Sequence, residues 1–138
     1  MLKSLAFLAF AGLLSFTQAS VADCGLGKSI FKIVDQNFSP EPPVAGQPYD
    51  YWFYYTVPEG VTVEAGTAKY SLTLNGLPFT PSTEDLCTQT ACPKTPGSYN
   101  ESSHDTWPGG VSGKIVSKLE WFDPNGNLLL CSQTTERV

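Results

Sequence analysis

The four cysteines constrain the fold of this 138-residue chain more than any other feature. They follow a leader-like N-terminal segment, and an even number of cysteines in that context is typical of a disulfide framework rather than of a metal or redox site. Cys87 and Cys92 are close enough in the sequence to meet within one loop. We therefore predict the disulfides Cys87–Cys92 and Cys24–Cys131. The second bond requires the start of the domain to lie beside its last strand.

Residues 1–22 have the pattern of a secretory signal peptide, with a basic start, an apolar run over residues 5–14 and small residues before the expected cleavage point. We place cleavage after Ala22, with cleavage after Ala19 as the alternative. The apolar run is shorter than the ~20 residues that a membrane-spanning helix needs. We therefore predict one soluble secreted domain over residues 23–138, outside the cell or in the lumen of the secretory or endolysosomal pathway.

The acidic charge balance argues against some partners. Lys plus Arg number 8 against 13 Asp plus Glu, a net charge of -5, and the basic residues are scattered along the chain. No basic run could follow a phosphate backbone, so we expect no nucleic-acid partner. For the same reason, stable attachment to an anionic membrane through a basic patch is disfavoured.

The mature chain is predicted to be all-β. Segments rich in aromatic and β-branched residues are separated by Gly and Pro turns, and several alternate between apolar and polar residues. Little helix is expected, because no segment holds a helical apolar period over several turns. Together these features predict an antiparallel sandwich. The expected strands are 29–34, 50–57, 61–64, 67–75, 113–122 and 127–134.

The strand that contains residues 49–57 carries aromatic residues on both of its faces. The alternation places Tyr49, Tyr51, Phe53, Tyr55 and Val57 on one face, and Trp52 and Tyr54 on the other. A sheet with one solvated side would alternate apolar with polar residues instead. Two interpretations remain open: an ordinary sandwich core with an amphipathic outer face, or an apolar cavity between the sheets that holds a small ligand.

No catalytic or metal-binding constellation is apparent. His104 is the only histidine, and we expect it to lie in an exposed loop rather than in a triad. Asp123 to Asn127 fits a hairpin turn better than a calcium loop, because its glycine comes too early for a calcium-binding sequence. The cysteine spacing fits neither a redox motif nor a zinc site. We predict a protein that is not an enzyme and that needs no cofactor or metal.

Short motifs in a fixed order run through the whole mature chain. They are Asp23-Cys24-Gly25, Gly46-Gln47-Pro48-Tyr49, Asn75-Gly76-Leu77-Pro78-Phe79, Cys87 to Cys92-Pro93, Gly97-Ser98-Tyr99, Trp107-Pro108, Leu119-Glu120-Trp121-Phe122-Asp123 and Leu130-Cys131. The ordered set resembles the ML lipid-recognition domain family, which includes the soluble Niemann-Pick type C sterol carrier and fungal phosphatidylglycerol and phosphatidylinositol transfer proteins.

The resemblance implies an immunoglobulin-like sandwich of two antiparallel sheets with an apolar cavity between them. It also implies a secreted, monomeric lipid-binding or lipid-transfer protein that touches membranes transiently. Where the animal sterol carrier has a further disulfide, this chain has Pro40-Glu41-Pro42-Pro43, so both a sterol and a phospholipid remain candidates. Apolar alternation and the family correspondence together predict the cavity lining: Phe53, Tyr55, Leu72, Leu74, Phe79, Tyr99, Val116, Leu119 and Trp121.

Two other functions remain open, as does glycosylation. A carbohydrate-binding module would expose Trp52, Trp107 or Trp121 as a flat platform, whereas a lipid-presenting recognition cofactor would share the cavity but bind a fixed receptor. Asn37 and Asn100 each begin an acceptor sequence for N-glycosylation. We favour Asn100, which lies in a polar, serine-rich stretch.

Overall fold

The computed structural model describes residues 18–41, 43–107, 109 and 112–137, and within them the chain forms nine strands and one short helix. Residues 1–17 of the predicted leader, and Pro42 and Pro108 of the motifs above, lie outside the described residues. The elements are β1 (Gln18–Asp23), β2 (Lys32–Ser39), β3 (Pro48–Val57), β4 (Thr67–Leu74), β5 (Leu77–Pro78), β6 (Ser82–Asp85), α2 (Leu86–Gln89), β7 (Gly97–Thr106), β8 (Lys114–Phe122) and β9 (Leu128–Arg137).

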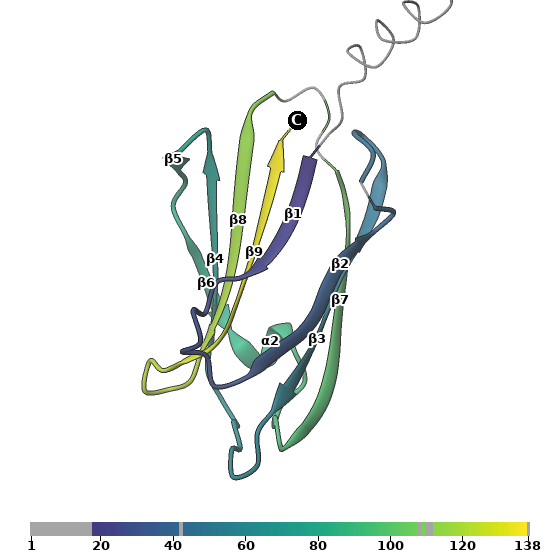
Figure 1. Ribbon diagram of the computed structural model, residues 1–138. Helices are drawn as coiled ribbons and strands as arrows, with labels where there is room; N and C mark the ends of the chain where they lie inside the picture. The colour runs from purple at the N-terminus through teal and green to yellow at the C-terminus, as the bar shows by residue number, and fades with distance from the viewer. Residues whose placement is uncertain (1–17, 42, 108, 110–111, 138) are drawn as a thin grey trace, which may run out of the picture.

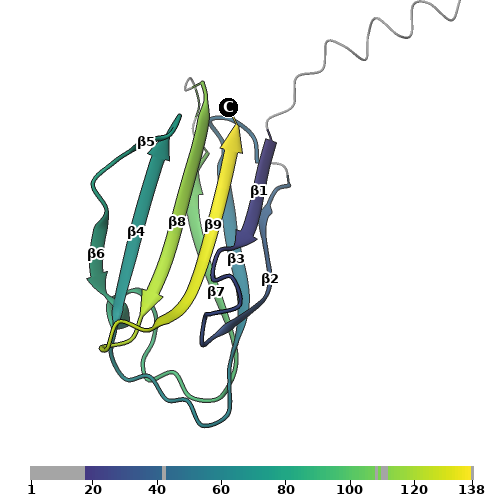
Figure 2. The same ribbon diagram turned by 60° about the vertical axis from the view of Figure 1, so that its left-hand side comes forward.

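The strands form two sheets that face each other (Figure 1). The larger sheet has the order β1-β9-β8-β4-β5, with β6 also paired to β4, and the smaller has the order β2-β3-β7. Figure 2 shows the larger sheet face-on, with β5 and β6 at one edge and β1 at the other. All of these pairings are antiparallel, so the predicted all-β sandwich of two antiparallel sheets is confirmed.

Alternation in the sequence located most of the long strands, and β7 is the main exception. The expected strands 50–57, 67–75, 113–122 and 127–134 correspond to β3, β4, β8 and β9, and 29–34 overlaps the start of β2. The expected strand 61–64 is reduced to one bridge between Val63 and Lys94. No hydrophobic pattern indicated β7, because most of its residues are polar on both faces.

The core fills the space between the sheets at the end that carries α2. Trp121 of β8 contacts the rings of Phe53 and Tyr55 of β3, with ring centroids 5.9 and 5.6 Å apart. Leu86 of α2 and Leu130 of β9 are fully buried in the same cluster. Aromatic side chains on the inner face of β3 therefore pack as solid core at this end of the sandwich.

Both predicted disulfides are present. Cys24 and Cys131 have Cα atoms 5.0 Å apart, and the backbone N–H of Cys24 donates to the carbonyl of Cys131 at 3.1 Å. Cys87 and Cys92 have Cα atoms 5.4 Å apart. The helix α2 carries Cys87, whose backbone N–H donates to the Asp85 carboxylate that caps the helix, at 2.8 Å.

The strand β1 contains both of the predicted cleavage positions. It pairs with β9, with Ala19 opposite Glu136 and Ala22 opposite Gln133. The domain boundary at residue 23 remains a prediction. Within the described residues, no helix is long and apolar enough to cross a membrane.

Candidate functional site

A cavity of about 130 Å³ lies between the two sheets, beyond the solid core. Strands of both sheets contribute to its walls. The lining residues are Phe38, Tyr49, Tyr51, Tyr70, Ser103, His104, Asp105, Ser117, Leu119, Ser132, Thr134 and Glu136. The cavity is therefore lined by aromatic rings and polar groups together, rather than by apolar side chains alone.

The inner faces of the strands change from apolar to polar along their length. Because alternate residues of a strand share a face, Leu130, Ser132, Thr134 and Glu136 of β9 follow one another along the inside of the larger sheet. Leu130 is in the core, while the three residues after it line the cavity. The first part of β9 thus belongs to the packed core, and its later residues form a polar wall of the cavity.

A hydrogen-bonded group of three side chains joins the sheets beside the cavity. The Ser132 hydroxyl of β9 donates to Gln36 Oε1 of β2 at 2.7 Å, and the Tyr51 hydroxyl of β3 donates to the same oxygen at 3.0 Å. The Tyr51 and Ser132 oxygens also lie within hydrogen-bond distance of each other, so two hydroxyl protons are shared among three contacts. Burial raises the pKa of Tyr51 to about 12, so its phenol stays neutral. The wall at this point offers neutral hydroxyl groups.

Glu136, near the C-terminal end of β9, is a buried acidic residue of the cavity lining. The residue is only 5% exposed, and no hydrogen bond to its carboxylate is present within the described part of the chain. Burial, and then the nearby Asp105, raises the pKa of Glu136 to about 7. The protein therefore desolvates an acidic side chain at the cavity without pairing it.

An aromatic cluster closes the cavity on the side of the smaller sheet. Trp107 is fully buried, and its ring centroid lies 5.3 Å from that of Phe38 and 5.1 Å from that of Tyr49. The backbone of Trp107 bonds to Gln47 and Gly46, which precede β3. This cluster anchors the segment before β3 to the end of β7.

Next to the cavity, the inner face of β4 and β5 carries a row of exposed and half-buried apolar side chains, here called the apolar strip: Tyr70, Leu72, Leu74, Leu77 and Phe79. Tyr70 lines the cavity, and Leu72 and Leu74 share its face by alternation. Leu77 pairs with Leu74, and the Phe79 N–H donates to the Leu72 carbonyl at 2.9 Å, which places both on the same face.

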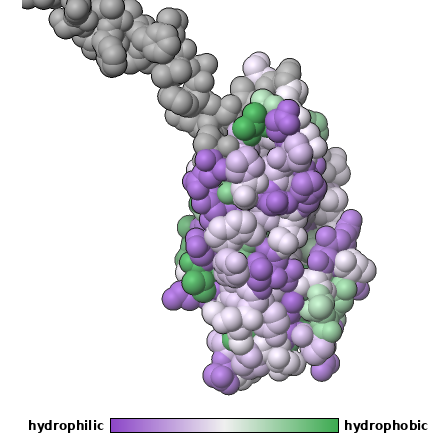
Figure 3. Space-filling view, turned by 90° about the vertical axis from the view of Figure 1, so that its right-hand side faces the viewer, coloured by the Kyte–Doolittle hydropathy of each residue, from purple (hydrophilic) through white to green (hydrophobic). Residues whose placement is uncertain are grey.

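The apolar strip lacks a covering sheet. Leu77 is 73% exposed and Phe79 is 52% exposed. Figures 1 and 2 show why: β4 and β5 lie at the edge of the larger sheet, and the smaller sheet has only three strands. By contrast, the outer face of the smaller sheet is mostly hydrophilic with isolated apolar residues (Figure 3).

The structure distributes the nine residues predicted to line a cavity among four places. Leu119 lines the cavity, whereas Leu72, Leu74 and Phe79 belong to the apolar strip. Phe53, Tyr55 and Trp121 are solid core, and Tyr99 stacks on Tyr55 at 5.4 Å. Val116 lies on the face of β8 opposite Ser117 and Leu119, because neighbouring residues of a strand point to opposite sides.

Sequence reasoning missed the polar wall of the cavity. Ser132, Thr134 and Glu136 continue the alternation that begins at Leu130, so the period of β9 could have placed them inside. The wall from β7, with Ser103 and Asp105, had no such signal, because that strand was not recognised.

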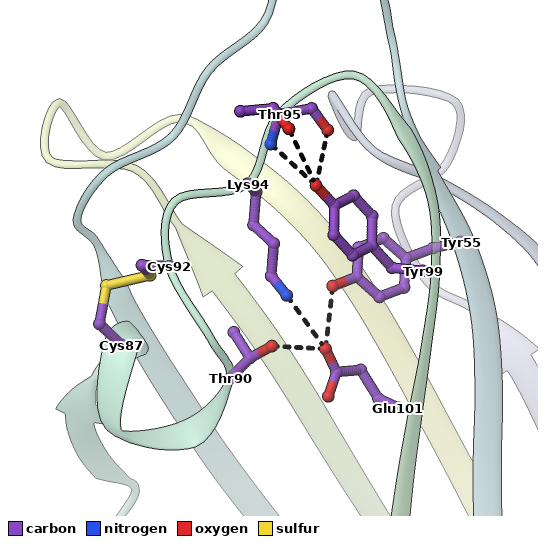
Figure 4. Close-up of polar contacts among 8 residues, drawn as sticks. All are labelled: Tyr55, Cys87, Thr90, Cys92, Lys94, Thr95, Tyr99 and Glu101. Atoms are coloured by element: carbon purple, nitrogen blue, oxygen red, sulfur yellow. Dashed lines mark hydrogen bonds and ion pairs between the residues drawn. A yellow bond between two sulfur atoms is a disulfide. The ribbon is translucent and has the colours of Figure 1, made fainter.

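A second buried polar group lies near the disulfide of α2 and is called the Lys94 cluster: Lys94, Glu101, Tyr55 and Thr90 (Figure 4). Lys94 is 3% exposed, and its Nζ lies 3.3 Å from Glu101 Oε1. The Tyr55 hydroxyl donates to the same oxygen at 3.0 Å, and the Thr90 hydroxyl also donates to it. Lys94 Nζ also lies 4.5 Å from the centroid of the Tyr99 ring. Every charge in this cluster has a partner.

His104 lies on strand β7 rather than in the expected loop. Its ring Nδ1 is 2.7 Å from Asp50 Oδ1 of β3, and the two side chains are 70% and 58% exposed. The strand conformation follows from pairing with β3, in which His104 lies opposite Asp50. Within the described residues no group of three potential metal ligands is present.

The remaining candidate residues lie away from the cavity. Trp107 and Trp121 are buried, so neither is available as an exposed platform, and Trp52 is half-buried beside Tyr54. Asn100 is exposed on β7. The Asn37 amide donates to Glu41 Oε2 at 2.6 Å.

Comparison with solved structures identifies the fold. The chain is similar to chicken MD-1 complexed with lipid IVa, with a TM-score of 0.60 and 13% identity over 90% of this chain and 91% of that one. It is also similar to a Niemann-Pick type C2 protein from the Japanese carpenter ant, with a TM-score of 0.59 and 16% identity over 84% of this chain and 96% of that one. No family model and no curated protein matches the sequence. The chain thus has the immunoglobulin-like sandwich fold of these two proteins.

Proposed function

We propose that this protein binds a lipid between its two sheets, with the apolar tail along the apolar strip and the polar group in the cavity. The observation that carries the proposal is the uncovered strip. A sandwich normally buries the inner faces of both sheets against each other, yet here Leu72, Leu77 and Phe79 are exposed on an inner face.

The physical driving force would be burial of the apolar strip. Removing apolar surface from water contributes about 25 cal/mol per Å², and exposed contiguous apolar surface often marks a ligand groove. Tyr70 connects the strip to the cavity, because its ring lines the cavity and its strand carries Leu72 and Leu74. A molecule with a polar end and an apolar end would match both surfaces at once.

The fold supports the same proposal. One of the two similar structures is a complex with lipid IVa, and the ordered motifs of this chain resemble the ML lipid-recognition family. A sterol and a phospholipid are both candidate ligands. By the same resemblance, we propose that the protein is a secreted monomer that is not an enzyme and that transfers its lipid during transient contact with membranes.

Lipid binding requires the cavity to widen. Its volume of about 130 Å³ is below the range of roughly 300–1,000 Å³ that is usual for ligand pockets. The element near the cavity that would move most readily is the edge strand β5, which has two residues and pairs with β4. We therefore expect the mouth beside β5 to open around the tail.

The test compares two apolar residues of similar exposure on different surfaces. Leu77→Asp places a charge in the strip, and Val34→Asp places the same charge on the smaller sheet, where Val34 is 64% exposed against 73% for Leu77. We expect Leu77→Asp to reduce binding of a fluorescent sterol and a fluorescent phospholipid at least about tenfold, and Val34→Asp to leave binding unchanged. Equal losses in the two variants, or no lipid bound by the unmodified protein, would contradict the proposal.

Two alternative functions give different results in the same preparation. A carbohydrate-binding module would be retained on a polysaccharide column and would yield no lipid on organic extraction. Burial of Trp107 and Trp121 removes two of the three tryptophans that could form its platform. A lipid-presenting cofactor would contain lipid and would also form a stable complex with one receptor.

A further inference from the structure

Most side chains that line the cavity carry a hydroxyl group, and the buried ones are held neutral. Ser117, Ser132 and Thr134 supply hydroxyls from the larger sheet, and Tyr49 and Tyr51 supply them from the smaller one. Burial raises the pKa of Tyr49 and of Tyr51 to about 12, so neither phenol ionises near neutral pH. These groups can both donate and accept hydrogen bonds. They would match a ligand whose polar end is itself a hydroxyl.

Two acidic side chains lie in the same walls. Asp105 of β7 and Glu136 of β9 line the cavity from opposite sheets, and Glu136 is 5% exposed. The repulsion between a carboxylate and an anionic head group is much stronger in such a partly dehydrated space than in water. An anionic lipid that entered the cavity would meet these two groups directly.

No basic side chain offsets the two carboxylates. The described lining residues include no Lys or Arg. The buried Lys94 is held by Glu101 at 3.3 Å in the Lys94 cluster. Arg137 directly follows Glu136 on β9, so it points to the opposite face of the sheet. His104 pairs with Asp50, and its side chain is 70% exposed.

Building on the proposed function, we propose that the ligand of this cavity is an amphiphile with an uncharged, hydroxyl-bearing head group. Asp105 and Glu136 are specificity-determining residues that exclude anionic lipids. The hydroxyl groups of Ser132 and Tyr51 receive the head group, and the apolar strip receives the tail.

The selectivity should weaken in acid. The lining around Glu136 includes Tyr49 and Tyr51 of β3, Tyr70 of β4 and Asp105 of β7, whereas β8 presents Ser117 and Leu119. His104, the residue before Asp105, pairs with Asp50 and is mostly exposed. Below its pKa of about 7 the Glu136 carboxyl is neutral, so it no longer repels an anionic head group. Discrimination against an anionic head group should therefore be larger at pH 8 than at pH 5.5.

The test uses three ligands that share one tail and differ only in charge: 1-dodecanol, dodecyl phosphate and dodecylamine. Calorimetric titration of the full secreted protein, below the micelle concentration, should show dodecanol binding at least about tenfold more tightly than dodecyl phosphate at pH 8. The double variant Glu136→Gln, Asp105→Asn should reduce this ratio to below about threefold. The control Glu59→Gln removes an exposed carboxylate outside the cavity and should leave the ratio unchanged.

Each other outcome contradicts a defined part of the proposal. Dodecyl phosphate binding as tightly as dodecanol overturns the exclusion of anions, and dodecylamine binding more tightly than dodecanol overturns the uncharged head group. A double variant that keeps the full ratio overturns the role of the two carboxylates. If none of the three ligands nor the fluorescent lipids bind, the proposed function fails and this inference fails with it.

Discussion

Glu101 and Glu136 are two carboxylates on inner strand faces of the same sandwich, and the protein treats them in opposite ways. Glu101 on β7 accepts from Lys94, Tyr55 and Thr90. Glu136 on β9 accepts no hydrogen bond within the described residues, and the like charge of Asp105 adds to burial in raising its pKa. Losing one partner of a buried, paired charge destabilises a protein strongly, whereas a buried carboxylate without a partner carries a desolvation cost in the folded protein.

The end of the sandwich that holds the Lys94 cluster and the end that holds the cavity have different roles. The Lys94 cluster joins the segment after the Cys87–Cys92 disulfide to the core through Tyr55, as Figure 4 shows. The cavity keeps polar groups that are partly dehydrated and available. The first end is built for stability, and the second is suited to a ligand that supplies the missing interactions.

Lys94→Met should give the largest effect, because it removes the cation and leaves Glu101 buried without its ion pair. Breaking a buried pair by removing one partner costs about 3–5 kcal/mol, and we expect a loss near the lower end because Glu101 is 23% exposed. Urea denaturation measures the free energy of unfolding. Lys69→Met, at a half-buried site outside this cluster, serves as the control. A loss below about 1 kcal/mol would show that the pair is not structural.

Glu136→Gln should give a smaller effect that depends on pH. The pKa of Glu136 rises from 4.5 to about 7 on folding, so between these values the folded state binds a proton that the unfolded state has released. Stability therefore falls as pH rises through this window, and the cost is complete above about pH 7. Near pH 8 the variant should be more stable than the unmodified protein by on the order of 1–2 kcal/mol, and near pH 4 the two should converge.

Denaturant titrations of both proteins at several pH values provide the measurement. A difference that stays constant with pH would mean that burial does not shift the titration of Glu136. A difference of the opposite sign would mean that the carboxylate has a favourable partner in the folded state.

His104→Ala should have the smallest effect on stability. It removes the partner of Asp50, a third carboxylate that is exposed rather than buried. The pair of His104 with Asp50 is 70% and 58% exposed, and surface ion pairs contribute about 0–1 kcal/mol. We expect a change below about 0.5 kcal/mol in unfolding free energy at pH 6. A larger loss would indicate that this pair, rather than backbone pairing alone, holds β7 against β3.

The sequence predicted the framework better than the site, and the reason lies in what hydrophobic alternation reports. Alternation identifies inward-facing apolar residues, and it located β3, β4 and β8 correctly. At the packed end those residues fill the space, so Phe53 and Trp121 became core rather than cavity lining. A cavity remains where the inward residues are small or polar, as at Ser117 and Ser132, and hydrophobicity gives no signal for them.

The strand β7 is a second feature that hydrophobic alternation could not predict. Its inner face presents Glu101, Ser103 and Asp105, and its outer face presents polar residues to solvent. Only the partner strand β3, which is not visible in the local sequence, makes this segment extended. The cysteines, in contrast, could be paired from spacing alone, because Cys87 and Cys92 are separated by too few residues to need information on the fold.

If the predicted signal peptide is removed, the pairing of β1 with β9 makes the position of cleavage structurally important. Cleavage after Ala19 would keep Ser20 to Asp23 paired with Thr135 to Ser132. Cleavage after Ala22 would instead remove most of β1 and leave the backbone groups of the C-terminal part of β9 unpaired. An unpaired strand edge can recruit another strand. The position of one peptide-bond cleavage would then decide whether β9, which carries Glu136, is an interior strand beside β1 or an edge strand that a second molecule could pair with.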